Sequence, residues 1–261
     1  MAESTQMSDI ALIQRVEAAA LWAWPPQETA RDEGWLLRAA DGHTRRANSV
    51  QALVFASGAD VERAIGRVES WYAKRGLPSC FQLTDRHAPA ALDRVLEQRG
   101  YARLTPVAVL LCDPAGIEPP KGPRIEIDTR PTPQVMNAVC DPHWDAAARR
   151  ARAELFGRIR RPLAFAVLLE GVQPVAGGLC VLDRELAGIF TLRTAVHARG
   201  KGHGRAVARR LAAWARGMGA RQLYLQVEEG NTASLALAAS LGAQMAYGYW
   251  YRELDAQAAN A

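Results

Sequence analysis

Apolar residues recur at helical spacing in residues 205–218, three or four positions apart along one stripe. They are Val207, Leu211, Trp214 and Met218. Residues 222–227 instead alternate between apolar and polar, as a half-buried strand does. A strand is also indicated at 188–196, before the helix, and a short helix that ends at Gly242 follows the second strand. This succession of strands and helices predicts an α/β (α+β) fold.

The same order of elements is predicted in the first half. It comprises a hairpin turning at Asp41 and Gly42, a helix, a strand, a second helix and a last strand. Their ranges are 34–40 and 47–55 for the hairpin, then 61–75, 79–83, 90–99 and 104–112. Asp60 is the expected N-cap of the first helix. In the second half, the corresponding hairpin comprises 164–169 and 175–182 and turns at Glu170 and Gly171.

The spacing of helix-ending glycines supports a duplication. Gly76 and Gly100 are 24 residues apart, and Gly219 and Gly242 are 23 apart. Between the halves, residues 113–123 hold four prolines and two glycines, which prevents a long regular element. We therefore predict domains at 1–115 and 124–261, joined by a linker at 116–123.

Composition narrows the class of protein. The chain has 261 residues, of which 49% are apolar and 23% charged, and no run approaches the ~20 apolar residues of a membrane span. Residues 10–24 are interrupted by Gln14, Arg15 and Glu17, so we expect a surface helix there, not a signal peptide. The four cysteines form no Cys-x-x-Cys pair, which favours reduced thiols, a cytoplasmic location and no metal.

The net charge of +5 permits an acidic partner without requiring one. Six arginines lie in residues 149–161, but an apolar stripe that starts at Trp144 runs through them. This pattern is typical of an amphipathic helix with a solvated basic face. Aromatic residues are not interleaved with the basic ones, so nucleic-acid binding is unlikely.

A glycine-rich loop separates the 188–196 strand from the 205–218 helix. It comprises Arg199, Gly200, Lys201, Gly202, His203 and Gly204. Glycines let successive backbone N–H groups point into one hollow, and the start of the helix favours an anion there. Lys201 is followed by Gly202, not by the hydroxyl residue of a P-loop, and Val207 stands where a dinucleotide fingerprint needs its third glycine. The loop therefore predicts a phosphate site of another kind.

Arg199, Gly202 and Gly204 fit the pattern Gln/Arg-x-x-Gly-x-Gly/Ala, and Asn231 and Gly242 stand at matching positions downstream. In this the chain resembles the GNAT superfamily of acetyl-CoA-dependent N-acetyltransferases. The resemblance implies two GNAT-like domains, each with a mixed, mostly antiparallel central sheet flanked by helices. It also implies acetyl-CoA as co-substrate, held in a V-shaped opening between two strands. The residues that it assigns to acetyl-CoA are Thr194, Ala195, Val196, Arg199, Gly200, Lys201, Gly202, His203, Gly204, Arg205 and Asn231.

The first half lacks this loop. Residues 55–60 hold one glycine, and Asp60 stands where a phosphate would bind. The first half thus resembles a degenerate GNAT copy, which supports the fold and shapes the substrate cleft.

The resemblance predicts acetyl transfer to a small-molecule or peptide amine by direct attack. Glu228 is the candidate base, although Glu228 or Glu229 could instead cap the next turn. Many family members carry a tyrosine, which protonates the leaving thiolate, seven residues after the asparagine, where this chain has Ala238. Tyr249 is the candidate replacement, with Tyr247 and Tyr251 as alternatives, or water serves.

Two other functions stay open at this point. The alanine at 238 favours a non-catalytic acyl-CoA-binding or regulatory module, and a relative that transfers acyl or aminoacyl groups to a larger acceptor is the weaker alternative. By the same resemblance, the 149–161 helix roofs the acceptor site, so we expect an acceptor with a carboxylate or phosphate.

Overall fold

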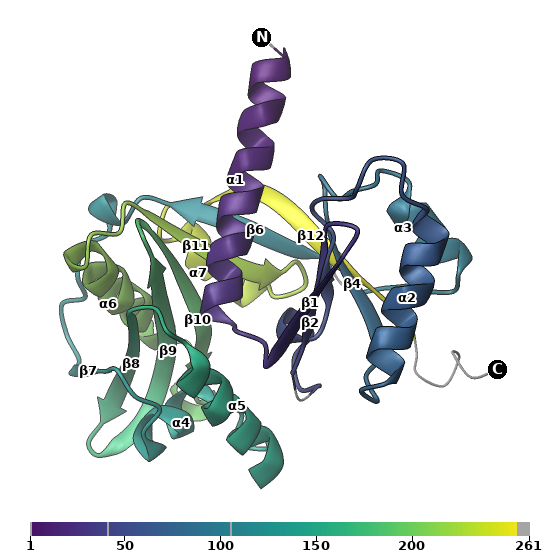
Figure 1. The fold of residues 1–261 in the computed structure, drawn as a ribbon. Coiled ribbons are helices and arrows are strands. Elements are labelled where there is room, and N and C mark those ends of the chain that lie inside the picture. Colours follow the sequence, from purple (N-terminus) through teal and green to yellow (C-terminus); the bar gives the residue numbers. More distant parts are fainter. Residues whose placement is uncertain (1, 41, 105, 255–261) are drawn as a thin grey trace.

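The computed structural model describes residues 2–40, 42–104 and 106–254, with side chains from residue 10 onward. One 12-stranded sheet forms its centre, in the order β1-β2-β3-β4-β12-β6-β11-β10-β9-β8-β7, with β5 beside β12 (Figure 1). The strands are β1 Glu28–Asp32, β2 Trp35–Ala39, β3 Val50–Gln51, β4 Ser79–Thr84, β5 Ala102–Arg103, β6 Val107–Cys112, β7 Ile125–Asp128, β8 Leu163–Glu170, β9 Gln173–Asp183, β10 Leu186–Thr194, β11 Gln222–Glu228 and β12 Gln244–Leu254. The β3–β4 and β10–β11 pairs are parallel and the other pairs antiparallel, as the predicted mixed, mostly antiparallel sheet requires.

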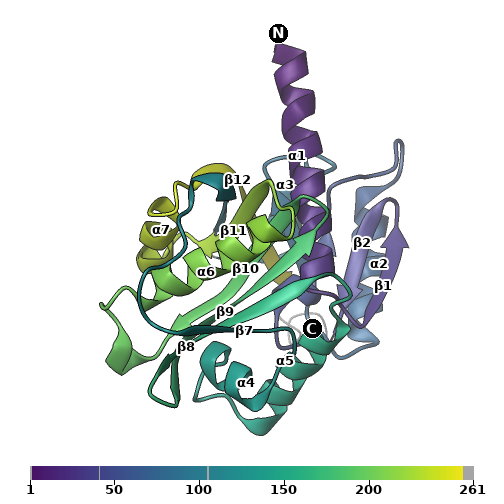
Figure 2. The same cartoon turned by 90° about the vertical axis from the view of Figure 1, so that its left-hand side faces the viewer.

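The helices lie on both faces of this sheet (Figure 2). They are α1 Ala2–Ala23, α2 Val61–Ala73, α3 Leu92–Gln98, α4 Pro133–Val139, α5 Ala146–Arg158, α6 His203–Gly217 and α7 Thr232–Ala239. Short 3-10 turns cover η1 Arg45–Ala47, η2 Pro114–Gly116 and η3 Val196–Ala198.

The last strands of the two halves are exchanged. β6 belongs to the first half by sequence, but it pairs with β11 and β12. β12 ends the second half, and its residues from Tyr249 to Leu254 pair with β4. The halves therefore share one sheet, whereas we had predicted a separate sheet in each.

Side-chain alternation along β8 divides the core of the second half into two layers. Phe165 and Val167 pack into a cluster with α1, α4 and α5, whereas Ala164 and Ala166 face α6. α6 buries Val207 and Leu211 as predicted. Met218, which we had placed on the same stripe, is 50% exposed because the helix has already ended at Gly217.

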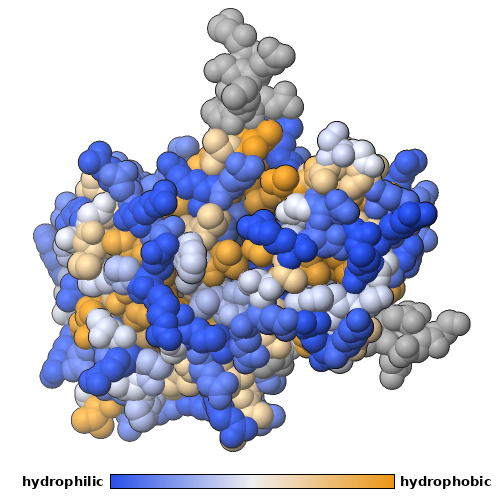
Figure 3. Space-filling view, in the orientation of Figure 1, coloured by the Kyte–Doolittle hydropathy of each residue, from blue (hydrophilic) through white to orange (hydrophobic). Residues whose placement is uncertain are grey.

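Helix α1 is a core helix, not the predicted surface helix. Val16, Ala20 and Ala23 are buried in the cluster that also contains β9 and β10 of the second half. The small side chains let the helix approach the sheet closely. Its outer side remains in solvent, where Trp22 is 45% exposed, and Figure 3 shows apolar side chains along the flank of this helix.

The hairpin predicted around Asp41 and Gly42 is confirmed in its antiparallel pairing of β2 with β3, but the pairing is shorter than predicted. Only Leu36 and Gln51 pair between β2 and β3, and Asp41 lies outside the described residues. The side chain of Asn48 organises the intervening segment instead. Its Oδ1 accepts from the N–H of Ala40 at 2.7 Å, and its Nδ2 donates to the carbonyl of Thr44 at 2.8 Å. These side-chain hydrogen bonds stand in place of the backbone hydrogen bonds that a longer hairpin would have formed between its strands.

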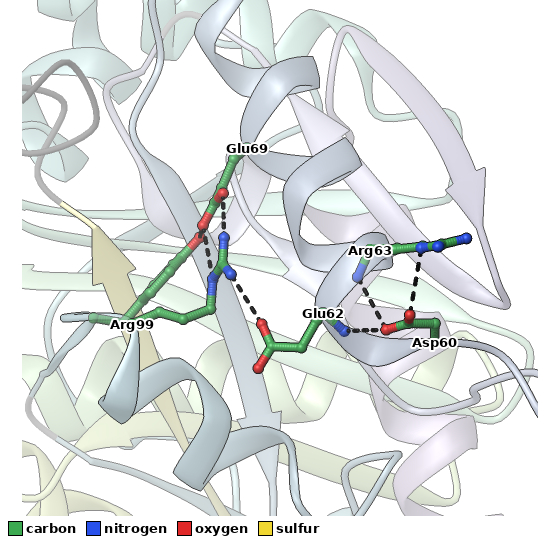
Figure 4. A network of polar contacts seen from close by, with 6 residues as sticks. Asp60, Glu62, Arg63, Glu69 and Arg99 are labelled. Atoms are coloured by element: carbon green, nitrogen blue, oxygen red, sulfur yellow. Dashed lines mark hydrogen bonds and ion pairs between the residues drawn. The ribbon is translucent and has the colours of Figure 1, made fainter.

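Other local predictions for the first half are confirmed. Asp60 caps α2 by accepting from the N–H groups of Glu62 and Arg63, and Arg99 bridges Glu62 and Glu69 on the same helix (Figure 4). The four repeated glycines all adopt the left-handed conformation that ends a helix, with φ between 65° and 94°. They are Gly76, Gly100, Gly219 and Gly242.

A buried carboxylate connects α1 with the sheet. Glu17 is 1% exposed and accepts from Tyr247 Oη at 2.7 Å, Gln82 Nε2 at 2.8 Å and Gln51 Nε2 at 3.0 Å. Replacing Glu17 by alanine leaves two buried donors and one partly buried donor without this acceptor. We expect the free energy of unfolding to fall by about 3–5 kcal/mol in urea denaturation of the full chain. Glu154→Ala, on the exposed side of α5, is the matched control, and an equal loss in both variants contradicts the assignment.

Candidate functional site

Strands β10 and β11 separate in the middle of the sheet. They pair from Leu186 and Gln222 up to Ile189 and Leu225, and beyond this point no residues of the two strands are paired. The register of β10 against β9 shifts just there, and Thr191 has φ 50°, which is uncommon outside glycine. The bulge turns β10 away from its neighbour, so a V-shaped opening lies between the two strands, as the resemblance predicts.

A cavity of about 390 Å³, here called the β10–β11 cavity, fills this opening. It is lined by Trp24, Thr44, Arg46, Arg152, Ile189, Phe190, Thr191, Leu192, Leu225, Gln226, Val227, Glu228, Asn231 and Ser234. Four lining side chains have a buried polar atom without a hydrogen-bond partner in the described part of the chain. These atoms are Trp24 Nε1, Arg46 Nε, Thr191 Oγ1 and Gln226 Oε1. Since buried polar groups are normally satisfied, this lining is suited to a polar ligand.

The cavity connects the two faces of the sheet. Along β11, Tyr224 packs with the α1 layer, whereas Leu225 and Val227 pack with the α6 layer. Strand alternation therefore places Gln226 and Glu228 on the α1 side. Asn231 and Ser234 belong to α7, whose Ala238 packs in the α6 layer. A ligand that enters on the α6 side can thus meet a second ligand on the α1 side.

The glycine-rich loop adopts the conformation that an anion site needs. Gly200 and Gly202 have φ of 78° and 80°, and Gly202 is the N-cap of α6 without a side-chain hydrogen bond. The first N–H groups of α6 thus lack a capping side chain. A Cβ at Gly204 would lie 3.3 Å from Leu237 Cδ1 and 3.4 Å from Thr194 Oγ1, so this position accommodates little more than glycine.

Glu170, at the end of β8, lies against this loop. Its Oε1 is 3.1 Å from His203 Nε2 and 3.4 Å from Lys201 Nζ. The hydrogen bond from His203, followed by that from Lys201, lowers the pKa of the Glu170 carboxyl. Glu170 therefore stays ionised. Its negative charge partly neutralises the positive charge of the loop, which would otherwise attract an anion more strongly.

The Glu170→Gln variant should bind acetyl-CoA more tightly, by about two- to fivefold in Kd, because the exposed carboxylate no longer competes for Lys201 and His203. The gain should shrink at high salt, since the interaction is screened. Calorimetric titration at two ionic strengths measures both effects. Weaker binding of the variant would mean that Glu170 positions the loop.

One edge of β10 faces the opening. The N–H of Ala195 donates to the carbonyl of Val175 at 2.8 Å, so it is engaged with β9. Since backbone groups alternate sides along a strand, the N–H of Thr194 points to the opposite edge, toward the opening. Within residues 194–196, the bond to Val175 excludes the N–H of Ala195 as the group that polarises a thioester, and Thr194 is the candidate that lies within β10.

A second cavity, here called the loop cavity, has a volume of about 830 Å³. It is lined by Gly42, His43, Thr44, Arg45, Arg46, Pro78, Arg103, Leu104, Val107, Gln226, Glu228, Tyr249, Tyr251 and Glu253. Thr44, Arg46, Gln226 and Glu228 line both cavities, so the two adjoin. Residues of the first half therefore form part of the wall of both cavities.

The predicted catalytic residues meet in this region. Glu228 ends β11 and lines both cavities. It does not cap the next turn with its side chain, because Asn231 Oδ1 accepts from the N–H of Ser234 at 3.0 Å and caps α7. No described side chain pairs with the Glu228 carboxylate, which leaves it available to a ligand.

The three tyrosines of β12 differ in their surroundings. Tyr247 donates to Glu17, and burial, followed by the Glu17 charge, raises its pKa, so its proton is held. Burial also raises the pKa of Tyr251. Tyr249 and Tyr251 both line the loop cavity, and neither lines the β10–β11 cavity. Tyr249 stays the candidate, with Tyr251 as its alternative.

The arginine-rich helix is only partly at the site. Arg152 lines the β10–β11 cavity and stacks on Trp24 and Trp144, each 4.8 Å from the ring centroid. Arg149 instead donates to Asn137 Oδ1 on the exposed surface. Five lining residues are not predicted as site residues from the sequence: Trp24, Thr44, Arg46, Gln226 and Ser234. Only the alternation of β11 offered a signal, since it places Gln226 on the same face as Glu228.

Comparison with known proteins identifies the family. Residues 10–252 match the family model described as "Probable histone acetyltransferase Rv0428c C-terminal". The chain belongs to this family. It is 27% identical over 243 residues to an uncharacterized N-acetyltransferase, YobR, of Bacillus subtilis, covering 90% of this chain and 95% of that protein. It is also 36% identical over 89 residues to a probable histone acetyltransferase, Rv0428c, of Mycobacterium tuberculosis, covering 34% of this chain and 28% of that protein.

Solved structures show the same fold. A GCN5-related N-acetyltransferase from Kribbella flavida superposes with a TM-score of 0.68 at 15% identity, covering 92% of this chain and 95% of that one. A tandem GNAT protein from the clavulanic acid biosynthesis pathway gives a TM-score of 0.66 at 14% identity, covering 91% and 87%. The predicted resemblance to the GNAT superfamily is confirmed, and the protein is a GNAT-family acetyltransferase.

Among the described helices, none has the length and apolar character to cross a membrane. All four cysteines are buried and free. The cytoplasmic location remains a prediction.

Proposed function

We propose that this protein transfers an acetyl group from acetyl-CoA to a primary amine by direct attack. The observation that carries the proposal is the opening between β10 and β11, with Glu228 and Asn231 in the lining of its cavity and the glycine-rich loop between β10 and α6 in the chain. Donor and acceptor can thus approach from opposite faces of the sheet.

The glycine-rich loop supplies the donor site. The first N–H groups of α6 and the positive end of its dipole favour the pyrophosphate, and Arg199, Lys201 and Arg205 add side-chain charge. The edge of β10 that faces the opening can pair with the pantetheine arm as an added strand would. The N–H of Thr194 then polarises the thioester carbonyl.

The reaction forms an N–C bond and breaks the C–S bond. Glu228 takes the proton of the attacking amine, directly or through water. The oxyanion is stabilised by the backbone donor on β10, and the thiolate of CoA leaves. Placing both reactants in one cleft supplies part of the rate enhancement.

The leaving thiolate requires a proton source other than residue 238. Ala238 is fully buried in the α6 layer, so it does not reach the cavity. Ser234 stands one turn earlier on the same side of α7 and does line the β10–β11 cavity. Its hydroxyl, or a water bound to it, is the candidate on this side of the opening, and Tyr249 is the candidate on the other.

Restoring the family tyrosine as Ala238→Tyr should therefore not restore an acid. We expect the ring to overpack the buried position and to reduce the free energy of unfolding by about 1–3 kcal/mol or more. Ser234→Ala should instead leave stability nearly unchanged and lower kcat. Thermal unfolding and thiol-release assays measure the two effects, and a faster, equally stable Ala238→Tyr protein contradicts this assignment.

The first half is proposed to be a degenerate GNAT copy, with boundaries at 1–115 and 124–261 around a linker. The matched element order and glycine positions support it, as does the exchange of β6 and β12. Its role is to complete the sheet and to wall the acceptor side of the cleft.

The decisive test is the release of free CoA thiol. The protein should bind acetyl-CoA in calorimetry and release thiol faster when an amine from a diverse panel is added. Binding without amine-dependent release favours the non-catalytic acyl-CoA-binding module. Absence of binding overturns the donor assignment itself.

A further inference from the structure

The segment 42–46 of the first half forms one wall of both cavities. Thr44 and Arg46 line both, and Gly42, His43 and Arg45 line the loop cavity. Asn48, which is 6% exposed, holds this segment through its bonds to Ala40 and Thr44. The first half of the chain therefore fixes the position of Arg46, whereas Glu228 and the glycine-rich loop belong to the second half.

Arg46 has a different environment from its neighbour Arg45. Arg45 donates to both carboxylate oxygens of Glu253, at 2.8 Å and 3.1 Å, so its charge is neutralised. Arg46 lies over the rings of Trp24 and Phe190, with its guanidinium carbon 5.4 Å and 5.7 Å from their centroids. Its guanidinium donates a side-chain hydrogen bond to Tyr249, but its Nε is buried without a partner, and within the described ranges no carboxylate forms an ion pair with it.

Such an arrangement is costly unless a ligand completes it. Aromatic rings stabilise a cation partly, but a buried guanidinium donor normally has an acceptor. The planar guanidinium offers parallel N–H groups that match the two oxygens of a carboxylate. Arg46 lines the cleft and is already held against the rings of Trp24 and Phe190. A carboxylate can therefore bind to its guanidinium without a rearrangement of the protein.

Glu228 supplies the opposite charge in the same space. It lines both cavities together with Arg46, and the two do not pair with each other. The loop cavity also contains Arg103, whose guanidinium carbon lies 4.4 Å from the Trp250 ring centroid. Arg45 and Glu253 neutralise each other, which leaves Arg46, Arg103 and Glu228 as the charged residues of the loop cavity. Arg152 adds a third arginine in the β10–β11 cavity. A polycationic peptide tail is repelled by this balance, whereas an amine with an attached anion is not.

On the basis of the proposed function, we infer that the acceptor is a small amino acid or a similar amino carboxylate. Its carboxylate is bound by Arg46, and its amine is presented to Glu228. The first half is then a specificity element, because it provides the group that selects acceptors by charge.

The test uses matched pairs of acceptors with the wild-type protein. Each of several α- and ω-amino acids is compared with its own carboxamide, which keeps the amine and removes the negative charge, and thiol release is followed at saturating acetyl-CoA. The acid should be preferred by about 10- to 100-fold in kcat/KM, mainly through KM, as a charge-assisted hydrogen bond predicts.

Substitutions then assign the preference to Arg46. Arg46→Gln should raise KM for the acid to that of the carboxamide and leave KM for acetyl-CoA within about twofold. Arg46→Lys keeps the charge without the planar fork and should restore part of the preference. The matched control is Arg221→Gln, since Arg221 is an exposed residue paired with Glu185 away from the cleft, and it should behave as wild type.

The alternative outcomes are distinct. Equal rates on acids and carboxamides, or faster transfer to lysine-containing basic peptides, overturn the acceptor assignment and leave the acetyltransferase proposal intact. Acetyl-CoA binding without transfer to any member of the panel also overturns it. The proposed function itself fails only if acetyl-CoA does not bind or no amine accelerates thiol release. The wild-type comparison holds even if Arg46→Gln unfolds.

Discussion

Replacing Gly202 by valine should abolish acetyl-CoA binding at concentrations where the wild-type protein is saturated. Gly202 has φ 80°, a conformation that a β-branched residue adopts only with strain, so the loop must rearrange. The rearrangement turns away the N–H groups at the start of α6. Loss of two hydrogen bonds to a charged phosphate, at about 1.5–3 kcal/mol each, corresponds to at least about 100-fold in Kd.

Gly204→Val tests the same loop by a different mechanism. Its backbone conformation is ordinary, but the side chain would press against Leu237 and Thr194. We again expect a loss of binding by calorimetry, with the far-ultraviolet circular dichroism of the folded protein retained. Gly217→Val is the matched control, because an added Cβ there meets nothing within 4 Å and lies at the other end of α6. Wild-type affinity in both loop variants rejects the phosphate assignment.

The loop and its flanking elements were predictable because their signals are local. Residues 200 and 202 have positive φ values, which favour glycine, and Val207 and Leu211 form an apolar stripe because one face of α6 is buried. Both signals can be recognised within a short stretch of sequence. The N-cap of α2 at Asp60 follows for the same reason.

The exchange of β6 and β12 was not predictable from the pattern. The strands β4 and β6 are both almost entirely buried, although β4 contains Ser79, Gln82 and Thr84, so neither pattern specifies which strand lies beside it. The burial of α1 is similar, since its apolar residues need a partner that is more than 150 residues away in sequence.

Arg46 was missed for a related reason. It follows Arg45 in a polar segment without periodicity, and such a pair normally indicates solvated surface. Its difference from Arg45 arises only because Trp24, Phe190 and Tyr249 surround it after folding. These contacts come from the residue directly after α1, from β10 and from β12, so only the tertiary structure brings the surroundings of Arg46 together.

Glu228→Gln should lower kcat by about 10²- to 10³-fold while KM for acetyl-CoA changes little. Glutamine keeps the shape and the hydrogen-bonding oxygen of glutamate but cannot accept the proton of an ammonium group. At neutral pH most of an amine acceptor is protonated, so the carboxylate is needed to produce the nucleophile. The defect should therefore shrink as the pH rises toward the pKa of the acceptor amine, because more of the amine is already neutral.

The matched control for this prediction is Glu229→Gln. Glu229 is the adjacent carboxylate, and its backbone N–H donates to the carbonyl of Pro106, but its side chain does not line either cavity. It carries the same charge in nearly the same place, so a general electrostatic effect on acceptor binding would lower the rate of both variants. A proton-accepting role affects Glu228 alone and gives a rate loss that depends on pH. Equal kcat in Glu228→Gln and Glu229→Gln across the pH range would show that the amine arrives already deprotonated or loses its proton to another group, and Glu228 would then lose its assignment as the base.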